Sequence, residues 1–498
     1  MAKAIMVQGT ASNAGKSLLV GALCRIFRQD GYRVAPFKAQ NMALNSFITA
    51  DGLEMGRAQV MQAEAAGVAP DVRMNPILLK PTSDVGSQVI VNGRSTGNRT
   101  ARDYWSDKKA LLPVVRAAYE SLAAEYDIIV IEGAGSPAEI NLKEDDLVNM
   151  GMARVADAPV LLVGDIDRGG VFASLYGTVK LLTPDEQDRI RGLIINKFRG
   201  DVDILRPGLD MLEDLTGKPV VGVVPYARVD IDDEDSLSDR LTADAPAGPA
   251  RVTLSVVRLP HLSNFTDFNT LGRIPGVCVR YTDTPDGLSD ADLILLPGTK
   301  NTIQDLKWLR ASGMEARLLQ RHAAGVPVFG VCGGYQMLGQ TLSDPDGVEG
   351  GGTVRGIGLL PTQTVFHAEK TTVQTAGRLG TIGGDLADLS GVETLGYEIH
   401  MGDTRLLPGA QPMQALSRGA ADGCWHENAY GTYLHGIFDL PAVADRLVRA
   451  LARKKGVTLD GAACDPVQYK EMQYDKLASI VRESLDLDAV YRILEEQS

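Results

Sequence analysis

The chain lacks several features that mark whole classes of proteins. Its five cysteines are widely spaced among 498 residues and include no Cys-x-x-Cys pair, which argues against a disulfide framework, a zinc site or a redox couple. No apolar run approaches the roughly 20 residues that span a bilayer, and the first residues show no basic stretch followed by an apolar run and a cleavage site. These absences predict a cytoplasmic protein with reduced thiols and no membrane association.

Basic residues are also in short supply. The 50 Lys and Arg are outnumbered by 63 Asp and Glu, which gives a formal net charge of −13. A nucleic-acid surface needs a basic stripe that displaces counterions, so we expect no nucleic-acid partner and favour a small-molecule substrate. No repeat of solenoid type is present either.

Hydrophobic residues make up 44% of the chain and charged residues 23%, as in an ordinary folded protein. A single core stops growing at roughly 250 to 300 residues, so two or three domains are expected. Short runs rich in Val and Ile alternate with stretches long enough for helices, which is the pattern of parallel sheets covered by helices. In the first half of the chain these runs are residues 4–8, 128–131, 159–163, 192–195 and 220–223.

The strand pattern restarts after an irregular acidic stretch. Residues 229–250 gather acidic side chains, Pro and Gly and keep no period, which is typical of a linker. Beyond them, three apolar runs end in Gly-containing turns, and helical spacing follows from Pro441. We therefore predict an α/β protein with two doubly wound domains of mainly parallel sheets. Its expected parts are a first domain (1–228), a linker (229–250), a second domain (251–440) and a C-terminal helical extension (441–498).

A glycine-rich loop follows the first predicted strand. The sequence GTASNAGKS, residues 9–17, stands between that strand and a helix-like segment. Such a loop points backbone N–H groups at a phosphate chain, while its Lys reaches the terminal phosphates and its Ser hydroxyl binds Mg²⁺. Five residues separate the glycines instead of the four of the strict Walker pattern, and a chance glycine turn is the alternative. The predicted nucleotide-binding residues are Gly9, Thr10, Asn13, Ala14, Gly15, Lys16 and Ser17.

Two carboxylates follow apolar strands of the same predicted sheet. Glu132 lies in IIVIEGAG and Asp165 in VLLVGDIDRGG, and ligands bind at the carboxyl ends of strands in open α/β sheets. We predict that Ser17, Glu132 and Asp165 hold Mg²⁺, with turn or helix-capping acids as the alternative. Asn196, in GLIINKF, is predicted to contact the adenine base, although a plain turn would give the same pattern.

These segments resemble the dethiobiotin synthetase type of ATP-dependent carboxylate-activating enzymes more closely than GTPases or motor ATPases. The resemblance covers the glycine loop, the EGAG segment and the Asn196-Lys197 pair. It implies that ATP phosphorylates a carboxyl group, with Lys38 in APFKAQN helping to hold the substrate. Ala11 and Asn13 stand where those synthetases carry acidic residues in the loop.

The second predicted domain carries a cysteine at a strand-to-helix turn. In PVFGVCGGYQMLG an apolar strand ends at Cys332, and Gly330, Gly333 and Gly334 permit a tight elbow. Such an elbow exposes a nucleophile, while N–H groups at the helix start favour the thiolate and stabilise an oxyanion. A thiolate needs a base, and His435 in YGTYLHGIFD follows another short apolar strand. We predict Cys332 as nucleophile and His435 as base; a structural histidine is the alternative for His435 alone.

The same segments resemble the class I, triad-type glutamine amidotransferases over roughly residues 251–440. The resemblance implies a thioester mechanism on glutamine. The residues that it implies at the oxyanion hole and the glutamine site are Gly298, Gly333 and Gln336.

The third member of the triad has no obvious counterpart. Most relatives place a Glu two residues after the His, but that position is Ile437 in this chain, with Asp439 nearby. The cobyric and cobyrinic acid amidases share this departure. The sequence therefore leaves open which residue orients His435.

The domain order and several segments, including KAQNMALNS (38–46) and MNPILLKP (74–81), resemble the cobyric acid synthase family over nearly the whole chain. The resemblance implies ATP- and glutamine-dependent amidation of the b, d, e and g carboxylates of adenosylcobyrinic acid a,c-diamide, in cobalamin biosynthesis. It implies ATP, Mg²⁺ and L-glutamine, a corrinoid substrate and no tightly bound prosthetic group. The residues predicted on the corrinoid side are Lys38, Gln40, Asn41 and Asn45, although a polar loop that caps a helix would look the same.

Three other functions stay open at this point. The sibling cobyrinic acid a,c-diamide synthase would share the chemistry on an earlier substrate, although the KAQNMALNS segment argues against it. A ParA-like nucleotide-switched binding protein would need no elbow cysteine and no glutaminase activity. A regulatory protein with an inactive glutaminase would be consistent with Ile437 at the position where most relatives carry the triad Glu. The sequence also leaves open whether the chain forms a homo-oligomer.

Overall fold

The computed structural model describes residues 2–83, 86–231 and 250–496. Most of the predicted linker, residues 232–249, lies outside them. The chain divides into two compact units. The first contains the described residues of 1–43, 54–232 and 470–498, and the second contains those of 44–53 and 233–469.

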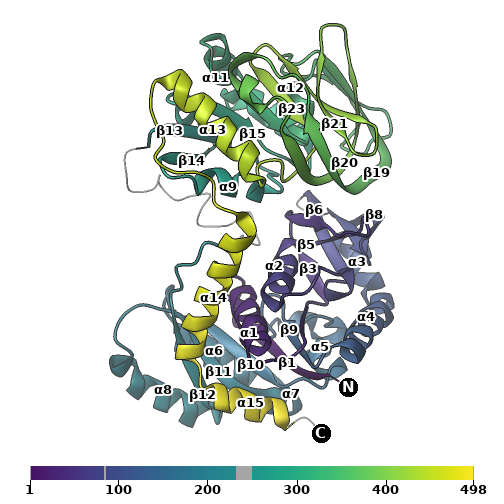
Figure 1. Ribbon diagram of the computed structural model, residues 1–498. Helices are drawn as coiled ribbons and strands as arrows, with labels where there is room; N and C mark the ends of the chain where they lie inside the picture. Colours follow the sequence, from purple (N-terminus) through teal and green to yellow (C-terminus); the bar gives the residue numbers. More distant parts are fainter. Residues whose placement is uncertain (1, 84–85, 232–249, 497–498) are drawn as a thin grey trace. The chain divides into compact units, whose positions relative to one another are not determined.

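The first unit is built on a six-stranded, wholly parallel sheet (Figure 1). Across the sheet its strands are β12 (Val220–Pro225), β11 (Ile190–Phe198), β10 (Val160–Asp165), β1 (Lys3–Gly9), β9 (Ile128–Glu132) and β2 (Val34–Phe37). The inner strands β9 and β10 are buried along almost their whole length, as their unbroken apolar runs predict for a sheet covered on both faces. Strand β1, which leads into the glycine loop, therefore lies inside the sheet between β9 and β10.

A smaller sheet and short helices complete this unit. The sheet contains β3 (Gln40–Met42), β6 (Ile77–Ser83), β7 (Gly86–Val91) and β8 (Arg94–Thr100). The short strand β5 (Glu54–Gly56) belongs to a separate two-stranded sheet. The helices are α1 (Lys16–Gln29), α2 (Arg57–Ala66), α3 (Ala101–Asp107), α4 (Leu112–Glu125), α5 (Met150–Val155), α6 (Val171–Leu181), α7 (Pro184–Arg189) and α8 (Val202–Thr216). Three 3-10 turns join them: η1 (Val72–Met74), η2 (Lys108–Leu111) and η3 (Ile140–Asp145).

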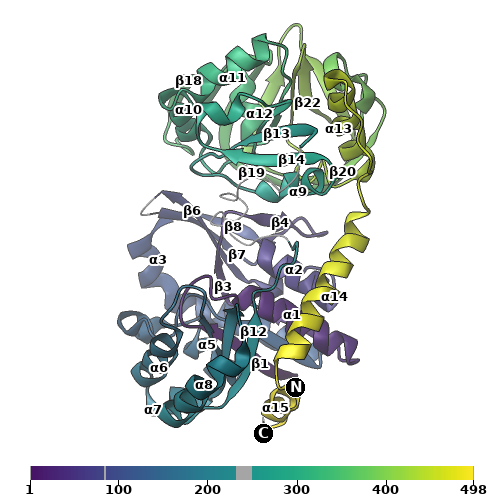
Figure 2. The ribbon, with the colours of Figure 1, turned by 90° about the vertical axis from the view of Figure 1, so that its left-hand side faces the viewer.

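The last two helices of the chain return to the first unit. From Lys470 onward, α14 (Pro466–Ser484) belongs to it, as does α15 (Leu487–Glu495). Leu477 of α14 is buried in the same apolar cluster as the inner face of α1. Arg25 of α1 pairs with Glu471 and Asp475 of α14, each at 2.8 Å. Helices α1 and α14 accordingly lie side by side in both views of the ribbon (Figures 1 and 2).

The second unit is organised around one mixed sheet of 11 strands. Its parallel half contains β14 (Val277–Thr282), β13 (Val252–Val257), β15 (Leu293–Leu296), β16 (Val328–Val331) and β23 (Ala429–Thr432). The sheet continues through β22 (Ala421–His426), β21 (Gln411–Leu416), β19 (Thr362–Leu379), β17 (Thr341–Asp344) and β18 (Gly352–Arg355), and β20 (Glu393–Leu406) pairs with β19. The α/β class predicted from the sequence is thus confirmed, with parallel pairing throughout the first large sheet and in half of the second.

The described helices of the second unit range in length from 4 to 15 residues. They are α9 (Asn269–Gly272), α10 (Thr302–Ala311), α11 (Met314–Ala323), α12 (Gly333–Leu338) and α13 (Pro441–Lys455), with 3-10 turns η5 (Phe265–Phe268), η6 (Pro285–Leu288) and η7 (Gly384–Leu389). The short strand β4 (Ser46–Ile48) also belongs to this unit, although it comes from the N-terminal part of the sequence. One apolar core extends under both halves of the sheet.

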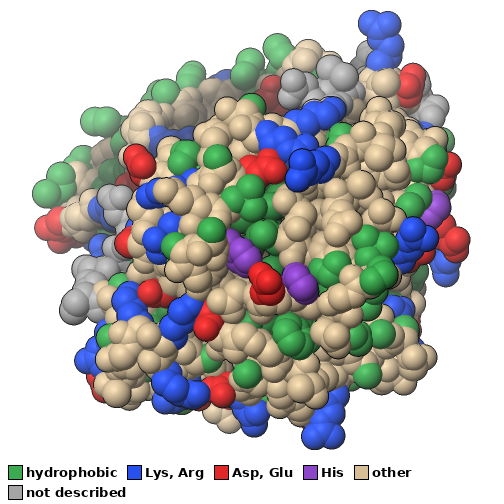
Figure 3. Space-filling model, turned by 90° about the horizontal axis from the view of Figure 1, so that it is seen from above, with side chains coloured by type: hydrophobic (Ala, Val, Ile, Leu, Met, Phe, Trp, Pro, Cys, Tyr) green, Lys and Arg blue, Asp and Glu red, His purple; other side chains and the backbone are tan. Residues whose placement is uncertain are grey.

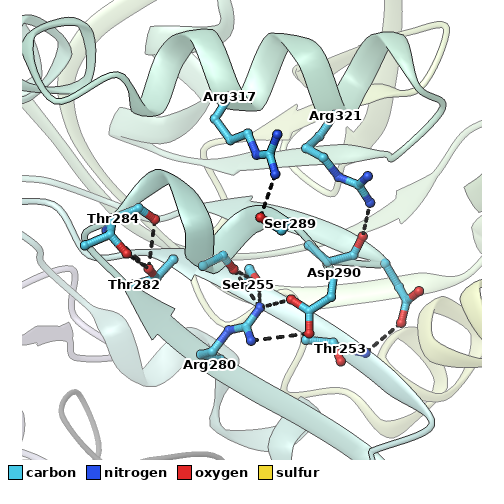
Figure 4. Close-up of polar contacts among 12 residues, drawn as sticks. Thr253, Ser255, Arg280, Thr282, Thr284, Ser289, Asp290, Arg317 and Arg321 are labelled. Carbon is cyan, nitrogen blue, oxygen red and sulfur yellow. Dashed lines mark hydrogen bonds and ion pairs between the residues drawn. The ribbon is translucent and has the colours of Figure 1, made fainter.

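A polar cluster fixes the loop between β14 and β15 (Figure 4). Arg280 of β14 donates to Ser255 Oγ on the neighbouring strand β13 (3.1 Å) and pairs with Asp290 in the loop. From helix α11, Arg317 donates to Ser289 Oγ (2.6 Å). The cluster joins two strands, a loop and a helix, and we assign it a structural role.

On the face of the molecule drawn in Figure 3, charges of both signs are interspersed with apolar side chains. This is the arrangement expected of a protein whose acidic excess is modest for its size. Within the described ranges, no helix is both long enough and apolar enough to cross a membrane.

Candidate active sites

Cys332 stands at the turn between β16 and α12. Its backbone has φ 50° and ψ −107°, a conformation that a residue other than Gly adopts only under strain. The elbow is tight enough that a Cβ added to Gly330 would lie 2.6 Å from the Gly334 carbonyl carbon, and one on Gly334 would lie 2.1 Å from the Leu296 carbonyl oxygen. The two glycines are therefore required by close backbone approach, and the strained turn presents the thiol at the end of a buried strand.

His435 reaches the thiol because two strands run side by side. Strand β23 pairs in parallel with β16, so that Val331 faces Thr432, and the Cys332 amide donates to the Thr432 carbonyl (2.8 Å). Three residues beyond this pair, the imidazole of His435 lies near enough to the Cys332 side chain for that side chain to raise its pKa. The thiol itself donates to the Ile399 carbonyl (3.6 Å). His435 is only 1% exposed and Cys332 8% exposed, so the pair is screened from bulk water.

Asp267 completes the arrangement, and sequence reasoning missed it. Its Oδ2 lies 2.7 Å from His435 Nδ1, and its Oδ1 accepts from the Gly436 amide (3.0 Å). The carboxylate is on the 3-10 turn η5 and is 3% exposed. A carboxylate at Nδ1 directs the other ring nitrogen, Nε2, toward the thiol, which is the geometry of a nucleophile, a base and an orienting acid.

The electrostatics of the site favour a charged imidazole. Burial lowers the pKa of His435, but the negative charges of Asp267 and of the Cys332 thiolate outweigh it and raise this pKa to about 10. A proton on His435 is the counterpart of a thiolate on Cys332. Asp267 and Cys332 together therefore favour the protonated form of the imidazole.

The two glycines predicted at the oxyanion hole lie beside this pair. A Cβ on Gly298 would come within 2.9 Å of the His435 ring. One on Gly333 would come within 3.1 Å of the Thr299 amide nitrogen, so the turn after β15 packs against the start of α12. Backbone N–H groups of two adjacent turns at a nucleophile are the usual source of an oxyanion hole. The assignment of these glycines to that role stays a prediction.

The Gln336 side chain is held at both ends. Its Nε2 donates to Tyr433 Oη (3.1 Å), and its Oε1 lies 3.1 Å from Thr302 Oγ1. The same hydroxyl lies 3.2 Å from Glu349 Oε1, and burial raises the pKa of Glu349 to about 7. Thr302 thus links Gln336 to Glu349, and the role predicted for Gln336 at the glutamine site stays a prediction.

The glycine loop joins β1 to α1. Asn13 (φ 60°) and Gly15 (φ 93°) adopt left-handed backbone conformations within it. Lys16 Nζ donates to the carbonyls of Ala11 (2.9 Å) and Gly135 (3.2 Å), which holds the ammonium over the loop. A loop that opens a 14-residue helix and carries a Lys in this position is suited to bind a phosphate chain.

The Glu132 carboxylate, at the end of β9, accepts hydrogen bonds from several polar side chains. Its Oε1 accepts from Ser17 Oγ (2.8 Å) and Lys38 Nζ (2.9 Å), and its Oε2 accepts from Gln62 Nε2 (2.6 Å). Across the described ranges, no three His, Cys, Asp or Glu side chains form a metal-binding group. Mg²⁺ in phosphate sites keeps several waters and takes one or two protein oxygens, so the Ser17 hydroxyl and the Glu132 carboxylate fit such an ion.

Asp165 and Asn196 stand on neighbouring strands of the same sheet. Asp165 accepts from Lys197 Nζ (2.9 Å) and from the Asp167 amide (2.9 Å). Asn196 Nδ2 donates to the Ala14 carbonyl (2.9 Å), so its side chain supports the glycine loop. The metal role predicted for Asp165 and the adenine contact predicted for Asn196 stay predictions.

The residues predicted on the corrinoid side fall into two groups. Lys38, Gln40 and Asn41 belong to the first unit, where Gln40 accepts from Tyr104 Oη (2.5 Å) and Asn41 donates to Gln59 Oε1 (3.0 Å). Asn45 belongs to the second unit and is 1% exposed. Neither polar atom of its amide finds a hydrogen-bond partner among the described residues.

Two family models match the chain and together cover most of it. The CobQ/CobB/MinD/ParA nucleotide binding domain matches residues 5–236, and the CobB/CobQ-like glutamine amidotransferase domain matches residues 253–443. The first match contains the glycine loop and Glu132. The second contains Asp267, Cys332 and His435.

Curated relatives match the chain from end to end. A cobyric acid synthase of Ruminiclostridium cellulolyticum is 57% identical over 504 residues, covering 100% of this chain and 98% of the relative. One from Lachnoclostridium phytofermentans is 56% identical with complete coverage of both chains, and one from Salmonella heidelberg is 52% identical, covering 99% of the relative. This chain is therefore similar to proteins of that name over both of its units.

Proposed function

The chain belongs to the cobyric acid synthase family, and from this premise we propose that it is an ATP-dependent, glutamine-hydrolysing ligase. Its substrate is adenosylcobyrinic acid a,c-diamide, whose b, d, e and g carboxylates it converts to carboxamides in cobalamin biosynthesis. The observation that carries the proposal is the Cys332, His435 and Asp267 constellation, on a chain whose other unit holds a phosphate loop. One site releases ammonia and the other activates the acid that receives it.

In the second unit, the reaction begins when the Cys332 thiolate attacks the side-chain amide carbon of glutamine. The carbonyl π electrons move to oxygen, and backbone N–H groups near Gly298 and Gly333 stabilise the negative charge that develops there. His435 gives its proton to the departing nitrogen, so the C–N bond breaks to yield ammonia and a thioester. Asp267 holds the ring in position and stabilises its positive charge.

The thioester is then hydrolysed. His435, now neutral, removes a proton from a water molecule that attacks the thioester carbonyl, and the C–S bond breaks to release glutamate and the thiolate. The low exposure of both side chains limits competing reactions of this intermediate.

In the first unit, the glycine loop and Lys16 position the phosphates of ATP. Mg²⁺, when bound by Ser17 and Glu132, would neutralise charge on the transferring phosphoryl group. A substrate carboxylate oxygen attacks the γ-phosphorus and ADP departs, which gives an acyl phosphate. Ammonia attacks its carbonyl carbon, and phosphate leaves as the amide forms. We assign to Lys38, which donates to Glu132 (2.9 Å), the role of holding the negatively charged acid.

Two rival functions lose their support. A ParA-like switch protein shares the nucleotide-binding domain, but not a glutaminase domain with a thiol, an imidazole and a carboxylate in contact. The sibling a,c-diamide synthase shares both domains. Full-length identity of 52–57% to several cobyric acid synthases favours the later substrate.

The test is amidation measured on two corrinoid acids. Purified protein with ATP, Mg²⁺ and glutamine should convert the a,c-diamide to a product with four further amides by mass spectrometry, releasing one glutamate and one ADP per amide. Cobyrinic acid that lacks the a and c amides should react poorly. Amidation of that acid only, or of neither acid, would contradict the proposal.

A further inference from the structure

Residues 44–53 are flanked in sequence by the first unit on both sides but belong to the second. We call them the inserted segment. Two side chains of β19 hold its backbone: Gln374 Nε2 donates to the Ile48 carbonyl (2.6 Å), and Thr372 Oγ1 donates to the Gly52 carbonyl (3.1 Å). The segment is therefore docked on the glutaminase by hydrogen bonds at two points.

The inserted segment contacts two residues, Tyr397 and Asn264, that touch the catalytic histidine. Tyr397 Oη donates to the Ser46 carbonyl (3.2 Å), while the Tyr397 ring stacks on the His435 imidazole with centroids 5.3 Å apart. The Ser46 amide donates to Asn264 Oδ1 (3.1 Å), while Asn264 Nδ2 lies 3.4 Å from His435 Nε2. Asn264 thus bridges the backbone of the segment and the ring nitrogen that faces the thiol.

The direction of the Asn264 amide follows from its two neighbours. A backbone N–H can only donate, so the Ser46 amide requires the oxygen of Asn264 on its side. The amide nitrogen must then face His435. Asn264 is 2% exposed and has a left-handed backbone (φ 52°, ψ 40°), which Asn tolerates better than most residues.

This orientation matters for the charge of the imidazole. A neutral ring offers the lone pair of Nε2 to the Asn264 NH₂ group, whereas an imidazolium would direct an N–H at another N–H. Asp267 and Cys332 favour the imidazolium, because both raise the pKa of His435. His400 would oppose it if charged, but burial lowers the pKa of His400 to about 4, so this neighbour is neutral. Of Asp267, Cys332, His400 and Asn264, it is Asn264 whose influence on the charge of the imidazole depends on the inserted segment, because the Ser46 amide fixes its orientation.

We infer that Asn264 is a positioning residue for His435 and that the inserted segment sets its orientation, so that the docked segment opposes the imidazolium form that Asp267 and Cys332 favour. When the segment leaves, the amide is free to turn and offer its oxygen to Nε2–H, which favours the imidazolium. The segment begins shortly after Lys38, Gln40 and Asn41 in the sequence. Binding of the acid and ATP near those residues is therefore the event that releases the segment. This link rests on the proposed function, because it assigns those residues to the acid.

The first test replaces the amide. Glutamate release is measured without corrinoid or ATP in wild type, Asn264→Asp and Asn264→Gly, the latter because Gly suits the left-handed backbone if Asp impairs folding. We expect basal kcat to rise about 5- to 10-fold in Asn264→Asp with little change in KM. The alkaline limb of its pH profile should move to higher pH, because a carboxylate stabilises the imidazolium. A profile that superimposes on wild type in both variants, or a fall in kcat without a shift, would overturn the inference.

The second test loosens the segment at a distance from the histidine. Gln374→Ala removes the bond to Ile48, and Gln363→Ala, on the same strand but bonded to Arg405, is the matched control. Adding adenosylcobyrinic acid a,c-diamide with ATP and Mg²⁺ should stimulate wild type and the control strongly. Gln374→Ala should show a raised basal rate and less stimulation. If Gln374→Ala is stimulated as strongly as wild type, the inference is overturned and the proposed function still stands. If wild type amidates no corrinoid, the proposed function itself is contradicted.

Discussion

At the scale of single residues, the catalytic histidine depends on a carboxylate that no spacing rule could locate. Asp267 lies 168 residues before His435 and reaches Nδ1 from a short 3-10 turn. The position where related enzymes carry their Glu is Ile437, which is 1% exposed in the apolar core. In this chain the orienting carboxylate therefore comes from another part of the fold.

Removal of the Asp267 charge should disable glutamine hydrolysis alone. In Asp267→Asn we expect kcat for glutamate release to fall on the order of 100- to 10,000-fold. The alkaline limb should move to lower pH, because the carboxylate helps to raise the pKa of His435 to about 10. Steady-state glutamate release across pH measures both effects, and amidation from ammonium should be unchanged.

Asp439 provides the matched control, because it is the acid that the sequence offers nearest to His435. Its Oδ1 accepts from Thr270 Oγ1 (3.1 Å). We expect Asp439→Asn to retain near wild-type turnover. Loss of activity in Asp439→Asn together with retention in Asp267→Asn would reverse the assignment.

Glu132 should be needed only for the ATP-dependent half of the reaction. Glu132→Gln keeps the size of the side chain but removes the charge that meets Ser17 and Lys38. We expect ADP formation with ammonium and the corrinoid acid to fall by at least about 100-fold, because an Mg²⁺ ligand is lost. Basal glutaminase activity should be unchanged. The same assays on Asp165→Asn compare the two predicted metal ligands, and normal ADP formation in Glu132→Gln would exclude Glu132 from this role.

At the scale of elements, the nucleophile elbow is held by close packing of backbone against backbone. In Gly334→Ala the new methyl group would lie 2.1 Å from the Leu296 carbonyl oxygen. The two backbone segments cannot move apart without disturbing the sheet. We expect the free energy of unfolding of the second unit to fall by about 1–3 kcal/mol or more. Urea unfolding followed by loss of glutaminase activity provides the measurement.

Gly272→Ala is the comparison for this change. Gly272 ends α9 in the same unit, and a Cβ there would meet only Val279, at the ordinary distance of 3.4 Å. We expect its stability to stay within about 0.5 kcal/mol of wild type. An equal loss in both variants would show that close approach at the elbow is not what makes Gly334 necessary.

Elements whose parts lie together in sequence could be predicted from it. The first strand, glycine loop and helix form one continuous run, as do the strand, Cys332 and the helix that follows, so local pattern was sufficient. The mixed pairing of β17–β22 and the docking of residues 44–53 could not be predicted. They depend on pairings between distant segments, which no local periodicity encodes.

At the scale of the whole molecule, each unit combines distant parts of the chain. The first unit is completed by α14 and α15, whose apolar residues pack in its core, and the second by the inserted segment. The sequence predicted the α/β class and a two-domain order, because apolar runs and an acidic stretch are visible in composition. It could not show that residues 44–53 belong to the second unit and residues 470–498 to the first. A helix that returns to a distant core has the same sequence pattern as one that packs locally.

The most direct test of the central claim, that one unit supplies ammonia to the other, is amidation of the corrinoid acid by Cys332→Ala. Wild type and variant are supplied with ATP, Mg²⁺ and either glutamine or ammonium chloride, and amides are counted by mass spectrometry. We predict that the variant forms no amide from glutamine but forms all four from ammonium at the wild-type rate. Amidation from glutamine by the variant, or failure of the folded variant with ammonium, would contradict the account.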